Sequence, residues 1–340
     1  MTSSSGLYNA APRGVVAVGA SAGGVEALTE LASSLPSDLP YAVLVALHMP
    51  PSAPSVLAQI IDRSGPLPAV SAAGGDKLES GKIYVAVPDR HLLVDDGQVV
   101  VSEGPTESGY RPAINALFRS VALSHGQNAI GVVLSGVLDD GVLGAGAIQA
   151  RGGITVAQRP DDAMFSAMPQ NAIGAGVIDH EAAATEIGAL LTQLAGREIE
   201  ERVMESDAKM QLENRIAMAG RFSTEFDGEA LGPPSGYTCP DCNGSLMHVD
   251  PRGFRCHVGH AWTVDALLEA RDDEVEQALW IALRSLQEKA KLARRMADHV
   301  GTGMMHRRYT DSADEAERAM SVLGKRLANV PSDVIERGGR

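Results

Sequence analysis

Three uninterrupted apolar segments organise the first half of the chain. They lie at residues 14–18 (GVVAV), 41–47 (YAVLVAL) and 129–134 (AIGVVL). Runs of this length without alternating polar positions are typical of strands buried on both faces, as in a parallel sheet covered by helices. The pattern predicts an α/β fold in which a doubly wound, mostly parallel sheet lies between two layers of helices.

Each of these segments is followed by a polar side chain suited to catalysis. Ser21 follows the first within the turn GASAG, His48 follows the second, and Asp139 and Asp140 follow the third. Because the carboxyl ends of parallel strands meet at one edge of a sheet, we expect these side chains to lie together. A serine hydroxyl becomes a good nucleophile when an imidazole accepts its proton and a carboxylate orients that imidazole. The pattern therefore predicts a serine hydrolase.

Simpler interpretations remain open for each of these residues. A strand, a Gly-rich turn and a helix also form dinucleotide sites, but Ser21 occupies the central position at which that fingerprint requires glycine. The segment is also compatible with an ordinary tight turn. His48 is compatible with a structural histidine, and Asp139 or Asp140 with a turn or helix-capping role.

Several segments resemble the catalytic domain of the chemotaxis protein-glutamate methylesterases (CheB-type enzymes). The resemblance implies a Rossmann-like three-layer fold, with Ser21 as nucleophile, His48 as general base and acid, and Asp140 as the orienting carboxylate. It also implies that the backbone N–H groups of Ala22 and Val137 form the oxyanion hole. The segments that carry it are residues 15–28 (VVAVGASAGGVEAL), 47–50 (LHMP), 83–94 (IYVAVPDRHLLV), 111–122 (RPAINALFRSVA), 133–144 (VLSGVLDDGVLG) and 156–173.

The implied reaction is hydrolysis of glutamate γ-methyl esters on a methylated, chemoreceptor-like protein, with release of methanol, and also deamidation of glutamine. No cofactor is implied for catalysis. The resemblance further implies a receiver domain before the esterase domain, whereas only residues 1–12, which we expect to be disordered, precede the first predicted strand. We therefore expect no receiver domain in this sequence.

Two positions depart from the family pattern. Ala22 stands where a second hydroxyl residue is usual, and Leu138 stands where glycine is usual. These departures keep an alternative open, namely a non-catalytic regulator or scaffold that binds receptor helices in the former active-site cleft. Arg111 also has two interpretations: it pairs with an acidic group of the substrate, or it caps a helix that begins near Pro112.

All three cysteines lie in one short segment of the second half. Cys239 and Cys242 form a C-x-x-C knuckle, and Cys256 and His260 supply a second pair. Three thiolates and one imidazole are a typical tetrahedral zinc set, and four protein ligands leave no open position for catalysis. The spacing predicts a structural zinc site. A redox thiol pair and unligated core cysteines are the alternatives.

The sequence around this knuckle has helical periodicity. We predict helices over residues 197–218, 265–296 and 312–330, with the last two packed as an antiparallel hairpin; a partner-binding coiled coil is the alternative. The expected organisation is a disordered segment (1–12), a methylesterase-like domain (13–194), a helix and linker (195–234), a zinc knuckle (235–264) and a helical hairpin (265–332).

Composition limits the remaining function classes. The net charge is −14, so no basic surface for nucleic acid is expected. No apolar stretch is long enough to span a membrane, and the amino terminus lacks the features of a secretory signal. We expect a cytoplasmic protein that contacts membrane receptors peripherally, without insertion.

Overall fold

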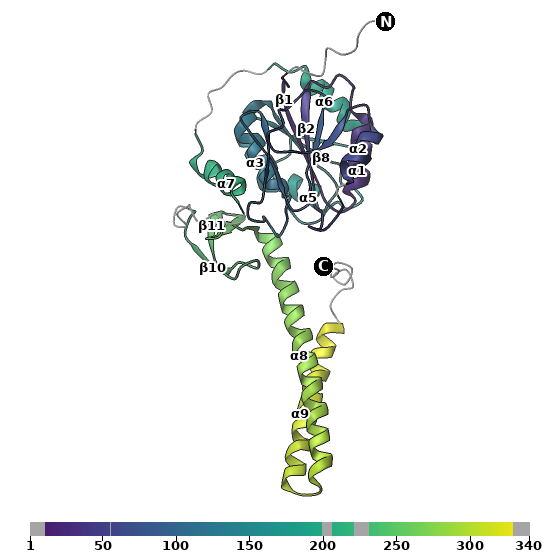
Figure 1. Ribbon diagram of the computed structural model, residues 1–340, viewed down its shortest axis with the longest axis vertical. Helices are drawn as coiled ribbons and strands as arrows, with labels where there is room; N and C mark the ends of the chain where they lie inside the picture. Colours follow the sequence, from purple (N-terminus) through teal and green to yellow (C-terminus); the bar gives the residue numbers. More distant parts are fainter. Residues whose placement is uncertain (1–10, 55, 199–205, 221–230, 329–340) are drawn as a thin grey trace. The chain divides into compact units, whose positions relative to one another are not determined.

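The computed structural model describes residues 11–54, 56–198, 206–220 and 231–328. Its contacts divide the chain into two compact units, Met1–Leu267 and Leu268–Arg340. The first unit contains a seven-stranded sheet with helices on both faces (Figure 1). The predicted α/β class is thereby confirmed.

All seven strands run parallel, in the order β3-β4-β2-β1-β7-β8-β9. The chain adds β2 on one side of β1 and later crosses to place β7 on the other side. Ligand sites of doubly wound sheets lie at the carboxyl ends of the strands at this reversal. The strands are β1 (Gly14–Ala20), β2 (Tyr41–Leu47), β3 (Ala69–Ser71), β4 (Ile83–Val85), β7 (Ala129–Val133), β8 (Ile154–Gln158) and β9 (His180–Ala182).

The two faces of the sheet are covered by different helices (Figure 1). Side chains of β1 alternate between two apolar clusters, with Val16 and Val18 in one and Val15 and Ala17 in the other. The first cluster includes helices α1 (Gly24–Ser34), α2 (Leu57–Ser64) and α6 (Ile187–Ala195). The second includes α3 (Ile114–His125), α4 (Val142–Ala150), α5 (Ala167–Gly174) and the hairpin of β5 (His91–Asp95) and β6 (Gln98–Ser102).

A small antiparallel sheet completes the first unit. Its strands are β10 (Pro234–Thr238), β11 (Ser245–Asp250), β12 (Gly253–Cys256) and β13 (Ala261–Thr263). We call this sheet the ribbon. Helix α7 (Ala208–Met218) packs against the ribbon. Ile216 of α7 shares one buried apolar cluster with Leu231 and with Met247 of β11.

Helix α8 (Val264–Val300) begins in the first unit and continues into the second, where α9 (Met304–Ala328) forms a hairpin with it. Buried alanines such as Ala293 and Ala313 allow close packing, and Arg294 forms ion pairs with Asp314 and Glu317. Within the described residues no helix is long and apolar enough to cross a membrane.

Three sequence expectations need correction or lie outside the described residues. Helix α7 begins at Ala208 and not at Arg197, which follows the C-cap of α6 and is not helical. The Asp207 side chain caps α7 by accepting from the Met210 N–H. Residues 199–205 of that predicted helix are not described. Helix α9 begins eight residues earlier than predicted, directly after a turn at residues 301–303. Residues 1–10, and residues 221–230 within the predicted helix and linker (195–234), also lie outside the described residues.

Candidate active site

Ser21 lies in a tight turn between β1 and α1. Its backbone N–H donates to the carbonyl of Ser135 (2.9 Å), and its own carbonyl accepts from Gly24 (2.9 Å). Gly23 adopts φ 67°, and a Cβ there would lie 2.8 Å from Ser135 Oγ. Glycine is therefore required at this position both by backbone conformation and by space. The turn places Ser21 at the carboxyl end of β1.

His48 follows β2 and lies between Ser21 and Asp140. Its Nδ1 is 3.1 Å from Ser21 Oγ, and its Nε2 is 2.7 Å from Asp140 Oδ2. The side chains of His48 and Asp140 are only 4% and 2% exposed. Asp140 is an acceptor only, so the imidazole proton belongs on Nε2, and Nδ1 is free to accept from the serine hydroxyl.

Asp140 is held at the amino terminus of α3. Its Oδ2 accepts from the backbone N–H of Ile114 (2.7 Å), and its Oδ1 accepts from that of Asn115 (2.9 Å). Two N–H donors and the positive end of the helix dipole stabilise the carboxylate charge. The Asn115 side chain reciprocates by accepting from the N–H groups of Gly141 and Gly144 at the start of α4.

Tyr110 is a site residue that sequence analysis missed. Its ring stacks on the His48 imidazole, with centroids 3.7 Å apart and an interplanar angle of 3°. Tyr110 precedes the cis peptide bond between Arg111 and Pro112. Nothing in the local pattern of the sequence signals this contact, because the two residues are 62 positions apart.

Two further backbone groups were predicted for the site, one in the turn after β1 and one in the loop after β7. Within the described chain, neither the Ala22 N–H nor the Val137 N–H has a hydrogen-bond acceptor. Leu138 adopts φ 62°, a left-handed conformation that favours glycine, and its carbonyl accepts from Asn171 Nδ2 (2.7 Å). This conformation gives a physical reason why glycine is usual in the family at the position that Leu138 occupies here.

Arg111 is held by partners within the protein. Its Nε and Nη2 donate to Asp89 Oδ1 (3.0 and 2.6 Å), and its Nη1 donates to the carbonyls of Glu103 and Gly104. The side chain is 14% exposed. The guanidinium therefore joins two loops and does not cap α3, which begins at Ile114. A role for Arg111 in binding substrate stays a prediction.

Asp139 has a different environment from Asp140. Burial raises the pKa of Asp139 to about 6, although a hydrogen bond from Thr263 Oγ1 (2.6 Å) acts in the opposite direction. Thr263 is the last residue of β13, so this bond joins the ribbon to the loop that carries Asp140.

The four predicted metal ligands lie close together in the ribbon. Their ligand atoms are all within 4.8 Å of one another. Cys239 Sγ and Cys256 Sγ lie 3.7 and 3.5 Å from His260 Nδ1, and Cys242 Sγ lies 3.7 Å from Cys256 Sγ. A tetrahedron with Zn–S of about 2.3 Å and Zn–N of about 2.0–2.1 Å has edges of about 3.5–3.8 Å. This arrangement could hold a metal ion.

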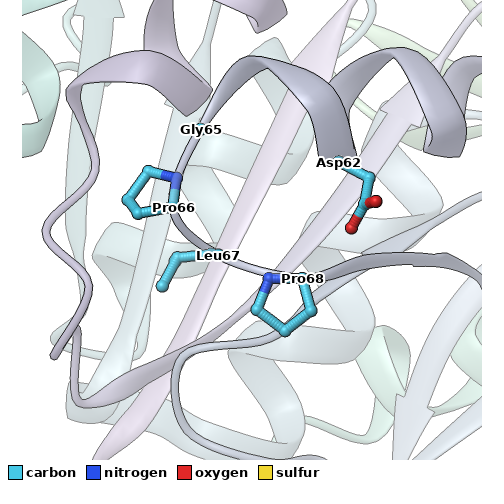
Figure 2. Close-up of a pocket in the computed structure, with 5 residues that line it drawn as sticks. All are labelled: Asp62, Gly65, Pro66, Leu67 and Pro68. Carbon is cyan, nitrogen blue, oxygen red and sulfur yellow. The ribbon is translucent and has the colours of Figure 1, made fainter.

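A pocket of about 430 Å³ lies elsewhere, in the loop between α2 and β3 (Figure 2). It is lined by Asp62 and residues 65–68. This loop leads into the amino end of β3, whereas Ser21, His48 and Asp140 follow the carboxyl ends of their strands. Asp62 Oδ1 accepts from the Ala69 N–H (2.9 Å), which is a structural role.

A family model described as CheB methylesterase matches residues 16–191, more than half of the chain. The chain belongs to the CheB methylesterase family. It is 36% identical over 181 residues to protein-glutamate methylesterase/protein-glutamine glutaminase 2 of Methanosarcina acetivorans, covering 51% of each chain. It is 42% identical over 171 residues to protein-glutamate methylesterase/protein-glutamine glutaminase 3 of Anaeromyxobacter dehalogenans, covering 49% of this chain and 50% of the relative.

The fold is similar to the crystal structure of the Thermotoga maritima CheB methylesterase catalytic domain. The TM-score is 0.51 at 28% identity, and the match covers 53% of this chain and 98% of that structure. The chain spans about half the length of the curated CheB relatives it matches. The ribbon and the helical hairpin lie outside the CheB family match.

Proposed function

We propose that this protein is a serine hydrolase that removes the methyl group from glutamate γ-methyl esters of a chemoreceptor-like protein and releases methanol. One observation carries the proposal: the Ser21 hydroxyl, the His48 imidazole and the Asp140 carboxylate form a continuous hydrogen-bonded chain at the carboxyl edge of the sheet. The names of the relatives support the same reaction class.

In the first step, Ser21 Oγ attacks the ester carbonyl while His48 Nδ1 accepts the hydroxyl proton. The carbonyl oxygen becomes an oxyanion, for which the N–H groups of Ala22 and Val137 are the proposed donors. Because neither donates within the described chain, both are available without breaking an existing bond. Asp140 stabilises the imidazolium that forms. His48 then protonates the leaving methoxide, which departs as methanol.

In the second step, water attacks the glutamyl ester of Ser21. His48 accepts a proton from this water and returns a proton to Ser21 Oγ, which releases the free glutamate side chain. A glutamine side chain would follow the same two steps with ammonia as the leaving group. We include this deamidation because the relatives are also named as glutaminases.

The proposed partner is a methylated receptor, which the protein contacts at the membrane surface without inserting into the membrane. We propose no nucleic-acid partner. We place the reaction in the cytoplasm, because three thiols at metal-ligand spacing persist best in a reducing compartment.

We propose zinc as the ion held by Cys239, Cys242, Cys256 and His260. The hydrogen bond between Cys239 and Cys256 lowers the pKa of Cys256 and raises that of Cys239, so one thiolate is favoured, and the thiolate is the form that binds zinc. Two tight turns shape the knuckles: the Cys239 carbonyl accepts from Asn243, and the Cys256 carbonyl accepts from Gly259. Zinc with four protein ligands stabilises the fold and takes no part in the hydrolysis.

The esterase proposal is tested with a chemoreceptor fragment that carries labelled glutamate γ-methyl esters. We expect the full-length protein to release labelled methanol and a fluorophosphonate probe to label Ser21. Ser21→Ala should abolish both signals, because it removes the proposed nucleophile. Methanol release by Ser21→Ala at the wild-type rate would refute the assignment. Binding of the fragment without turnover by the wild-type protein would favour the non-catalytic alternative.

A further inference from the structure

The ribbon is joined to the loop that approaches His48. Strand β13 pairs with this loop in a parallel bridge between Ala261 and Glu107. The Ala261 N–H donates to the Thr106 carbonyl (3.1 Å), and the Ala261 carbonyl accepts from the Ser108 N–H (2.6 Å). The ribbon therefore extends its sheet onto this loop by main-chain hydrogen bonds.

The loop is a tight turn that ends at Tyr110. Glu107 and Tyr110 exchange both backbone hydrogen bonds (3.2 and 2.9 Å), and the central residues Ser108 and Gly109 adopt φ 51° and φ 77°. Two consecutive left-handed residues define a narrow turn with a fixed direction. The turn thereby fixes the position of Tyr110, whose ring stacks on the His48 imidazole.

A buried ion cluster attaches the same turn to the body of the protein and to the ribbon. Glu107 pairs with Arg119 of α3 (2.5 Å) and with Arg255 of β12 (3.0 Å). Burial alone would raise the pKa of Glu107, but the two guanidinium groups outweigh it and lower the pKa to about 2. Separating the ribbon would leave buried charges unpaired, which is costly.

A second connection reaches the turn that carries Asp140. Thr263 Oγ1 donates to Asp139 Oδ1 (2.6 Å) and accepts from the Ala266 N–H (3.2 Å). Thr263 is therefore the N-cap of α8 and a direct partner of the residue before Asp140. It is 2% exposed.

We propose that the ribbon positions two groups of the esterase site. Thr263 is a positioning residue for Asp140, and the turn that pairs with β13 holds Tyr110 against His48. This inference rests on the proposed esterase function and extends it. The imidazolium formed during acylation lies against the face of the Tyr110 ring, which attracts a cation. Displacement of a catalytic group by about 1 Å can cost about a hundredfold in rate. The ribbon therefore limits movement of both partners of His48.

The test uses the full-length protein with Thr263→Val, Thr263→Ser and Asp207→Ala. Valine keeps the shape of threonine but lacks the hydroxyl, whereas serine keeps the hydroxyl. Asp207→Ala is the matched control, because it removes another helix cap, at the start of α7, that does not touch the site. Metal content and thermal unfolding verify that each variant is folded.

We expect Thr263→Val to lower kcat and the rate of fluorophosphonate labelling about tenfold, with KM changed less than about twofold. Thr263→Ser should restore both rates, and Asp207→Ala should lower only the thermal stability. A second pair probes the other connection: Tyr110→Leu should slow labelling about tenfold, and Tyr110→Phe, which keeps the ring, should recover most of this loss.

Two results would overturn the inference. One is an active wild-type protein whose Thr263→Val and Tyr110→Leu variants both keep wild-type kcat and labelling. The other is an equal loss in Thr263→Val and Thr263→Ser, because the hydroxyl would then not be responsible. An unlabelled, inactive wild-type protein would instead refute the esterase proposal itself.

Discussion

Asp140→Asn separates the charge of the carboxylate from its shape. The Oδ2 atom of Asp140 faces two donors, the Ile114 N–H and His48 Nε2, and the Oδ1 atom faces the Asn115 N–H. An amide has only one acceptor oxygen. If this oxygen replaces Oδ2, the amide nitrogen faces the Asn115 N–H. If the nitrogen replaces Oδ2, His48 must carry its proton on Nδ1, and it can no longer accept from Ser21.

The expected loss follows from the missing charge. A carboxylate and an imidazolium about 4 Å apart attract by about 4 kcal/mol at an effective dielectric constant of 20. Because 1.36 kcal/mol corresponds to a factor of ten, kcat should fall about a thousandfold. In either orientation, the N–H group of Ile114 or Asn115 faces the amide nitrogen of the new asparagine and loses its acceptor. This loss should lower the free energy of unfolding by about 1–3 kcal/mol.

The assay is methanol release from the methyl-labelled receptor fragment, together with urea unfolding of each variant. Asp179→Asn is the matched control, because Asp179 accepts from the backbone N–H and the hydroxyl of Thr155 but does not contact the triad. It should lose stability and keep kcat. A kcat for Asp140→Asn within about threefold of the wild-type value would show that the charge does not assist the reaction.

Two further predictions concern pH and metal. The pKa of Asp139 is about 6 in the folded protein and 3.8 in the free residue. Between these pH values the folded state binds a proton that the unfolded state has lost. The free energy of unfolding therefore falls as the pH rises from about 4 to about 6. Asp139→Asn should therefore stabilise the protein by up to about 3 kcal/mol at pH 7.5 and little at pH 4 in urea unfolding; an equal difference at both values would contradict this. Purified protein should contain about one zinc per chain, and Cys242→Ser should lose it and unfold the ribbon, while the α/β part stays folded. Full zinc content in this variant would exclude the assigned ligand set.

The sequence predicted the elements whose signal is local. Continuous apolar runs identified the central strands, and the small residues around Ser21 identified the tight turn after the first of them. The four proposed metal ligands could be chosen because their spacing reflects two short knuckles. The start of α7 was predicted wrongly, since composition alone does not reveal that Gly196 ends α6 and that Asp207 caps a new helix.

Contacts between distant segments could not be predicted in this way. Thr263 and Asp139 are 124 positions apart, and neither residue type signals the other. Tyr110 belongs to a turn whose direction depends on left-handed backbone at Ser108 and Gly109, and serine carries little signal for that conformation. The sequence therefore indicated the chemistry of the site more fully than the elements that hold it.

The adjacent carboxylates after β7 illustrate this difference. In sequence, Asp139 and Asp140 are equivalent candidates at the end of one strand, and only the family resemblance separated them. In the structure, Asp140 accepts hydrogen bonds from two N–H groups at a helix amino terminus and faces His48. Asp139 is buried and accepts a hydrogen bond from the Thr263 hydroxyl of the ribbon. Burial raises the pKa of Asp139 more than the Thr263 hydroxyl and the Arg252 guanidinium lower it, so a charge there is costly. The helix terminus makes a charge favourable at Asp140, where the imidazolium needs it.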